Sequence, residues 1–338
     1  MEHFGQALAG IFGRLWTLLS APGSQFSLTS LSCALLVAVA LVAMRRISRK
    51  RRLRLRATLR TLFPRRVIRH KSLRADAGFF LFNVFVYAGV AGYAAISYQF
   101  LTNAIVDGLV AALGAPEPVL PLGAARGIVT LMLFLAYELG YWIDHYLKHR
   151  VPALWELHKA HHTAEVLTPL TTFRMHPLDT WFFANILAVT MATVSGVASW
   201  FFGDTAQQYV ISGNNLLLVL FIHAYVHLQH THVWIAFRGW AGRIFLSPAH
   251  HQIHHSTDPT HFNRNFGSCL ALWDWMFGTL HVPAAKREKM TFGVLPARVD
   301  VHSLTAELIA PVGHALAALL PARKPAGMSP GATSSAAE

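Results

Sequence analysis

Three short clusters of histidine are the residues of this sequence best suited to chemistry. Within each cluster the histidines stand three or four residues apart, and residues at these separations share one face of a helix. Imidazole nitrogen is a common ligand of zinc, iron, copper and nickel. The clusters are His145 and His149 in "DHYLKH", His158, His161 and His162 in "HKAHH", and His251, His254 and His255 in "HQIHH".

A fourth group of histidines is spaced at i, i+4 and i+7, at the end of an apolar run. It consists of His223, His227 and His230, followed by His232. We expect this group to add at least one metal ligand, with His230 the first choice. The neighbour of the third cluster, His250, points about 100° away from His251 on a helix and is expected to support the ligands. The roles of His176, His223 and His232 stay open.

The number of imidazoles favours two metal ions over one. Structural zinc sites are usually closed sets of four ligands, often with cysteine, whereas about ten histidines are available here without cysteine. Iron would explain why an open metal site lies beside the hydrocarbon of the membrane, because iron can activate O2 for attack on an unreactive C–H bond. The residues alone do not separate iron from zinc.

The composition predicts that these clusters belong to a membrane protein. Of 338 residues, 54% are hydrophobic and only 13% are charged, whereas a soluble domain typically carries about 25% charged residues. Aromatic residues make up 12% of the chain, which suits membrane spans and their interfacial belts. We therefore expect a multi-pass integral membrane protein.

Apolar runs close to the ~20 residues needed to cross a bilayer recur along the chain. The expected fold is all-α, a polytopic membrane helical bundle of about four to five spans with a histidine-rich helical cap on the cytoplasmic side. Residues 103–126, which include Gly114 and several prolines, read as a loop on the opposite side. The runs are 28–44, 77–102, 127–143, 180–202 and 209–224, the last two joined by a turn at Gly203 and Asp204.

A dense basic block sets the expected orientation. Fourteen Lys and Arg residues fall between Arg45 and Arg74, directly between two apolar runs. Such a segment favours the cytoplasmic side and anionic lipid, and no nucleic-acid-reading module accompanies it. With this block in the cytoplasm, alternating spans bring every histidine cluster to the cytoplasmic face, and we expect no nucleic-acid partner.

The combined motifs resemble the fatty acid hydroxylase and sterol desaturase superfamily of membrane di-iron enzymes. The resemblance rests on HxxxH and two HxxHH boxes, and on the continuation "SPAHHQIHHSTDPTHFNRNFGSCLALWDWMFGT". It covers about residues 127–282. It implies an enzyme that hydroxylates or desaturates a lipid with two iron ions (Fe2+/Fe3+), with zinc as a possible substitute.

The resemblance also implies the ligands and partners. O2 is the cosubstrate, and electrons come from a separate reductase, ferredoxin or cytochrome, because no cytochrome, flavin or ferredoxin motif is present in the sequence. Four carboxylates near the boxes, Glu138, Asp144, Glu156 and Asp274, are expected to orient ligand N–H groups. The implied metal ligands are His145, His149, His158, His161, His162, His227, His230, His251, His254 and His255.

The same features divide the chain into three parts. Residues 1–76 are expected to hold one span and the basic segment, residues 77–285 the catalytic membrane domain, and residues 286–338 an extension with a disordered tail.

The alternative function is a histidine-rich membrane protein that binds zinc for structure, transport or sensing. Ionisable residues at mid-span would favour transport, and the runs 77–102 and 180–202 have none there.

Overall fold

A computed structural model describes most of the chain and is almost entirely helical. It describes residues 9–10, 12–13, 15–17, 19–22, 24, 27–87, 95–117, 120–203, 205–294 and 300–320. The strands in this part form one small hairpin, in which β1 (Val210–Ile211) pairs antiparallel with β2 (Asn214–Asn215). The all-α prediction is confirmed. The expected disordered tail lies outside the described residues.

Three helices in the described part are long and apolar enough to cross a membrane: α2 (Leu28–Ser48), α8 (Leu122–Arg150) and α10 (Pro177–Phe202). Shorter apolar helices are α7 (Tyr98–Leu113), α16 (Leu304–Leu319) and the stretch from α11 (Leu216–Phe221) to α12 (His227–Gln229). Large apolar side chains on the outside of α8 and α10, such as Leu131 and Phe201, are half exposed. This pattern is that of an integral membrane protein.

Two of the expected apolar runs do not form single long helices. Run 77–102 divides into α5 (Lys71–Leu81), a π-helical turn η1 (Phe82–Tyr87) and the start of α7, with residues 88–94 outside the described part. Run 209–224 begins with the β1–β2 hairpin, and the chain becomes helical only at Leu216. Asn215 caps that start, because its side chain accepts hydrogen bonds from the amides of Leu217 and Leu218.

The prediction of a loop over residues 103–126 was wrong at both ends. Helix α7 continues to Leu113, and α8 begins at Leu122. Apart from Asp107, residues 104–113 are apolar or glycine and complete a helix that the loop assignment cut short. The helix stops at Gly114, whose φ of 77° is a conformation that glycine adopts without strain. Gly203 ends α10 in the same way, whereas Asp204 lies outside the described residues.

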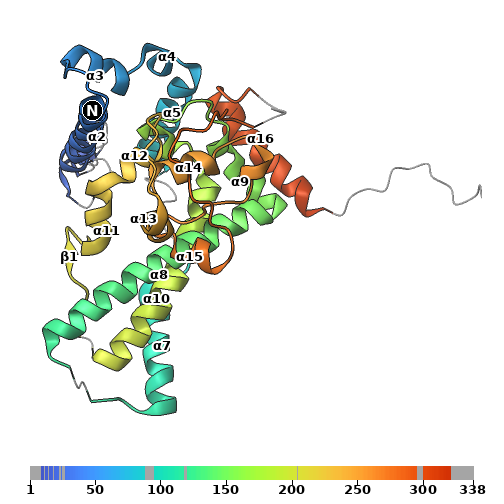
Figure 1. The fold of residues 1–338 in the computed structure, drawn as a ribbon. Helices are drawn as coiled ribbons and strands as arrows, with labels where there is room; N and C mark the ends of the chain where they lie inside the picture. The colour runs from blue at the N-terminus through green and yellow to red at the C-terminus, as the bar shows by residue number, and fades with distance from the viewer. Residues whose placement is uncertain are drawn as a thin grey trace, which may run out of the picture.

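Helix α10 packs between α7 and α8 at the apolar end of the molecule (Figure 1). A glycine makes one of these contacts possible. A Cβ on Gly140 of α8 would lie 2.4 Å from Thr190 Oγ1 and 2.9 Å from Leu187 Cδ2 of α10. The two helices that reach from the membrane to the histidines are therefore held close together.

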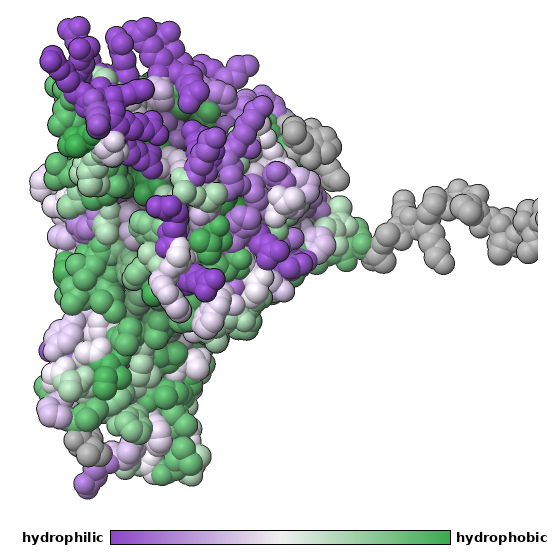
Figure 2. Space-filling model, viewed as in Figure 1, coloured by the Kyte–Doolittle hydropathy of each residue, from purple (hydrophilic) through white to green (hydrophobic). Residues whose placement is uncertain are grey.

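The remaining short elements gather at the opposite, polar end (Figure 1). Figure 2 shows hydrophilic residues concentrated there and apolar residues covering α7 and the far ends of α8 and α10. The elements are α3 (Leu55–Leu62), α4 (Arg65–Ile68), α9 (Pro152–His162), η2 (Pro169–Phe173), η3 (Ile222–Val226), α13 (Gly239–Ile244), α14 (Pro248–His254), η4 (Pro259–His261) and α15 (Leu272–Met276).

Candidate metal centre

Nine buried or nearly buried histidines converge into two adjacent groups. The ligand atoms within each group all lie within 4.8 Å of one another. The five-histidine group contains His145, His149, His158, His162 and His254, and the four-histidine group contains His161, His230, His251 and His255. The groups touch, since the rings of His162 and His255 stack with centroids 4.5 Å apart.

Local sequence explains how α8, α9 and α14 bring most of these rings together, whereas His230 comes from the end of α12. Helix α8 ends at Arg150 and α9 starts at Pro152, so only Val151 separates the two helices that carry the first two clusters. A proline is tolerated in the first turn of a helix but not in its interior, so the chain turns there and α9 folds back against α8. Helix α14 also starts with a proline, Pro248, after the capping residue Ser247.

In the five-histidine group one ring nitrogen of each residue faces a common centre. The Nε2 atoms of all five are buried and have no hydrogen-bond partner among the described residues. A buried polar atom left without a partner costs free energy. Five such atoms converging on one point are best explained by a metal ion.

In the four-histidine group the Nε2 atoms lie in a row. His230 Nε2 is 3.2 Å from His161 Nε2 and 2.7 Å from His251 Nε2, and His251 Nε2 is 3.1 Å from His255 Nε2. A ring nitrogen carries either one proton or one lone pair. The Nε2 atoms of His230 and His251 each face two others, so hydrogen bonds cannot satisfy all three contacts, whereas one shared cation can.

In several of these histidines the other ring nitrogen, Nδ1, contacts a backbone carbonyl or a side chain of the protein. His145 Nδ1 lies 2.8 Å from the carbonyl oxygen of Phe266, and His254 Nδ1 lies 2.8 Å from that of Arg264. His230 Nδ1 lies 3.1 Å from Thr172 Oγ1. A carbonyl accepts only from Nδ1–H, which leaves Nε2 as the free lone pair, the usual arrangement of metal-binding histidines.

A carboxylate that the sequence analysis did not single out, Asp179, supports the five-histidine group. Asp179 Oδ2 lies 3.4 Å from His158 Nδ1, and Asp179 Oδ1 lies 2.7 Å from Lys148 Nζ. The lysine is fully buried and also contacts Asp144 Oδ2 at 2.6 Å. Asp179 is 21 residues from His158 in the sequence, and its signal was its place in the first turn of α10, in "HPLD".

The expectation that four other carboxylates orient ligand N–H groups is not what the structure shows. Asp274 accepts from the amides of Phe266 and Gly267, both at 2.8 Å, and Glu138 accepts from those of Cys269 and Leu270. These two carboxylates fix the loop whose carbonyls contact His145 and His254, so they support the histidines indirectly. Asp144 pairs with Lys148, and Glu156 pairs with Lys159 and His314.

Burial keeps the imidazoles outside the membrane helices neutral. Desolvation lowers the pKa of His230 and of His254 to about 3. It lowers the pKa of His161, His251 and His255 well below the usual value, with neighbouring histidines adding to the effect. Neutral imidazole is the form that binds metals.

The other histidines considered from the sequence lie outside both groups. His227 is buried, with Nε2 3.2 Å from Ser30 Oγ of α2, so the structure does not bring it to the nine. His250 caps its own helix through Ser247, His176 contacts the carbonyl of Leu308, His223 that of Val219, and His232 that of Thr61.

A cavity of about 1140 Å³ opens onto both groups. Its lining includes His145 and His158 from one group and His161 and His230 from the other. Toward the membrane helices it is lined by apolar and aromatic residues such as Tyr137, Tyr141 and Phe183. A long apolar molecule in this cavity would reach the histidines from the membrane side.

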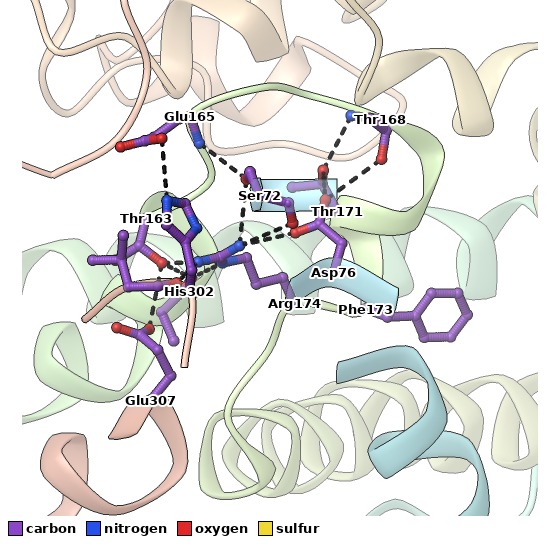
Figure 3. Close-up of polar contacts among 12 residues, drawn as sticks. Ser72, Asp76, Thr163, Glu165, Thr168, Thr171, Phe173, Arg174, His302 and Glu307 are labelled. Atoms are coloured by element: carbon purple, nitrogen blue, oxygen red, sulfur yellow. Dashed lines mark hydrogen bonds and ion pairs between the residues drawn. The ribbon is translucent and has the colours of Figure 1, made fainter. Parts of the chain in front are cut away.

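A second polar network holds the end of α9 (Figure 3). Arg174 is fully buried and donates to Asp76 Oδ1 at 3.0 Å, to the carbonyl of Ala160 at 3.1 Å and to Thr163 Oγ1 at 3.0 Å. Thr163 also donates to Glu307 of α16. Arg174 therefore links α5, α9 and, through Thr163, α16, and its role is structural.

Comparison with known proteins agrees with this geometry. Residues 130–279 match the family described as fatty acid hydroxylase. The chain is 28% identical to human alkylglycerol monooxygenase over 178 residues, which cover 51% of this chain and 36% of that protein. It is 30% identical to an ornithine lipid hydroxylase of Rhizobium tropici over 46% of this chain and 42% of that protein.

A third relative is human cholesterol 25-hydroxylase, 30% identical over 46% of this chain and 53% of that protein. The chain thus spans between about a third and a half of the length of these relatives. No solved structure matches it.

Proposed function

We propose that this chain is a membrane di-iron oxygenase that hydroxylates or desaturates a lipid, as the match of residues 130–279 to the fatty acid hydroxylase family suggests. The observation that carries the proposal is the pair of converging histidine groups at the wall of a cavity in the apolar helices. The proposed ligands are the nine histidines of the two groups. His227 is left out because it contacts Ser30 instead.

The residues fit two iron ions. They supply neutral nitrogen donors without thiolates, and imidazole suits iron as well as zinc. Iron, when bound, supplies redox chemistry with O2 that can oxidise an unactivated C–H bond. Asp179, Phe266 and Arg264 hold the Nδ1 sides of three ligands, so that each Nε2 stays directed at the metal.

The cavity supports a lipid substrate. Its apolar wall lies between α8 and α10, and its polar end holds histidines together with Asp144 and Lys148. The names of the relatives refer to an alkylglycerol, an ornithine lipid and cholesterol, which share an apolar body and a small polar part. We propose a lipid of this kind, oxidised at a carbon of its apolar body, with electrons supplied by a separate reductase, ferredoxin or cytochrome.

Orientation and domain division are also proposed. The basic segment 45–74 lies at the same polar end as α9 and α14, which carry most of the histidines (Figures 1 and 2), and this supports a cytoplasmic active site. Within the expected division, residues 77–285 contain all nine proposed ligands.

Lipid profiling of cells with and without this chain, grown under O2, tests the proposed activity. We expect a lipid that gains an oxygen atom or a double bond only in cells that express the chain. His158→Ala and His254→Ala should each abolish the product, because each removes a proposed ligand. His232→Ala is the matched control, since His232 lies outside both groups and contacts Thr61. Full product formation by either ligand variant would refute the assignment.

A further inference from the structure

A third cluster of metal-binding side chains lies outside the two histidine groups. His261, His281 and Glu288 offer three ligand atoms that all lie within 4.8 Å of one another. His261 ends η4, whereas His281 and Glu288 come from the chain that follows α15. Two separate segments of the chain therefore meet at one point. We propose that they form a third metal site, for one divalent ion of the zinc type.

The distance between His261 and Glu288 is compatible with coordination of a shared ion. His261 Nε2 lies 3.3 Å from Glu288 Oε2, whereas charge-assisted hydrogen bonds are typically about 2.7–2.9 Å long. Two ligands bound tetrahedrally to zinc at about 2.0–2.1 Å are about 3.3 Å apart. The 3.3 Å distance between the two side chains is therefore compatible with a shared ion, and the proposal rests on the convergence of all three ligand atoms.

The two imidazoles meet as the proposed ligands of the dinuclear centre do. The rings of His261 and His281 are 5.3 Å apart and cross at 81°. Within the four-histidine group, the rings of His161 and His230 are 5.0 Å apart and cross at 83°. Perpendicular rings at this spacing can direct one nitrogen each to the same ion.

An independent observation is the burial of His261. Its side chain is 6% exposed, and its Nδ1 has no hydrogen-bond partner among the described residues. A buried imidazole with an unpartnered nitrogen costs free energy unless something binds the ring. The ion would bind the other ring nitrogen, Nε2, which faces Glu288, and two imidazoles with one carboxylate are an established donor set for zinc and ferrous iron.

The surrounding chain is already fixed in position. The side chain of Asn265 donates to the carbonyls of His250 and His281 and accepts from the amide of His281 at 2.7 Å. Thr257 and Thr291 pair nearby, with a 3.0 Å backbone hydrogen bond. An ion at the third site would tie the segment around Glu288 to the loop after α14. That loop supplies the Arg264 carbonyl that contacts His254.

This site is separate from the proposed oxygenase chemistry. His281 and Glu288 lie beyond residues 130–279, which match the fatty acid hydroxylase family. Both are half-buried at the surface, so the ion would exchange with solvent more readily than ions in the buried groups. Its role would be to stabilise the loops over α14.

Zinc binding by the purified full-length protein in detergent tests the proposal. After equilibrium dialysis against Zn2+, His281→Ala and Glu288→Gln should each hold one equivalent fewer than wild type. Zn2+ should also raise the melting temperature less in these variants, because binding to the folded state stabilises it. The double variant His158→Ala with His254→Ala should keep the third zinc, whatever its effect on lipid oxidation.

Glu165→Gln is the matched control. Glu165 is also partly exposed and contacts two histidines, with His302 Nε2 at 3.3 Å, but it belongs to no group of three ligand atoms. It should hold as much zinc as wild type. Wild-type zinc content in either His281→Ala or Glu288→Gln would overturn the proposal, as would an equal loss of zinc in Glu165→Gln.

Discussion

At the residue scale, the direction of each proposed ligand nitrogen, Nε2, depends on what the Nδ1 atom of the same ring contacts. The loop carbonyls of Phe266 and Arg264 fix two rings, and the carboxylate of Asp179 faces a third. Asp274 and Glu138 fix that loop through four backbone amides. Most acidic residues of the site therefore stabilise the backbone around the histidines and do not contact the histidines directly.

Asp179→Asn should weaken metal binding by about 10- to 100-fold, the usual effect of losing a carboxylate behind a histidine ligand. The amide cannot balance the charge of Lys148, which would be left with Asp144 alone. Chelator competition on purified protein measures this loss. Asp107→Asn, on the exposed side of α7, is the control. Wild-type resistance to the chelator in Asp179→Asn would contradict the supporting role.

The spacing of the histidines was enough to predict which of them share a helix face. The way the histidines divide into two groups in space was harder to predict from the sequence. His161 and His162 are adjacent in sequence but belong to different groups, because neighbours on a helix point about 100° apart. His227 has ligand-like spacing yet faces Ser30, since the π-helical turn η3 precedes it and changes the direction of its side chain.

At the element scale, the site depends on how α9 is held between α8 and α16. The chain reverses at Val151 and Pro152, and Arg174 secures the far end of α9 through the Ala160 carbonyl and Thr163. Helix α16 packs along α9 and brings Glu307 to Thr163. The proline at the start of α9 was visible in the sequence, but the contact with α16 joins residues 144 positions apart and could not be predicted.

The predicted element boundaries that proved wrong have physical explanations. An apolar run predicts burial in lipid or core without specifying a continuous helix. Run 209–224 therefore contains a hairpin, with Gly213 at a φ of 78°. Conversely, Asp107 and Gly108 interrupted the hydropathy of α7 without interrupting its helix.

Glu307 should make stability depend on pH. Burial raises the pKa of its carboxyl from 4.5 to about 7, against the opposing effects of Arg174 and the Thr163 hydrogen bond. The unfolded chain therefore loses this proton first, and stability falls as the pH rises from about 4.5 through about 7. Between pH 6 and pH 8 the loss should be about 1 kcal/mol.

Glu307→Gln should remove this part of the pH dependence, because the amide stays neutral and can still accept from Thr163. Melting temperatures in detergent at pH 6 and pH 8 measure the difference. Glu117→Gln, an exposed change of the same kind, should leave the wild-type dependence intact. An unchanged pH dependence in Glu307→Gln would show that the carboxyl ionises normally.

At the scale of the whole molecule, the basic residues and the histidine groups lie at the same end. The basic segment, the histidine groups and the short helices form the polar end, and α7 with the far ends of α8 and α10 forms the apolar end (Figures 1 and 2). Composition alone predicted a membrane protein, and three helices meet the length and hydropathy required.

Cysteine labelling in intact cells tests the proposed orientation. With a membrane-impermeant maleimide, Ala115→Cys should react, because it follows α7 at the apolar end. Arg60→Cys, in the basic segment, should react only after lysis. Wild-type protein, with Cys33 and Cys269, gives the background. The reverse labelling pattern would place the active site on the other side of the membrane.

The metal content of the purified protein tests the central claim most directly. Protein expressed with 57Fe should contain two irons per chain, with a Mössbauer spectrum of nitrogen-ligated iron that changes on reduction and exposure to O2. His158→Ala with His254→Ala should lose that signal. Tightly bound zinc at the two histidine groups, with no iron and no iron-dependent turnover, would contradict the oxygenase and favour a zinc-binding membrane protein.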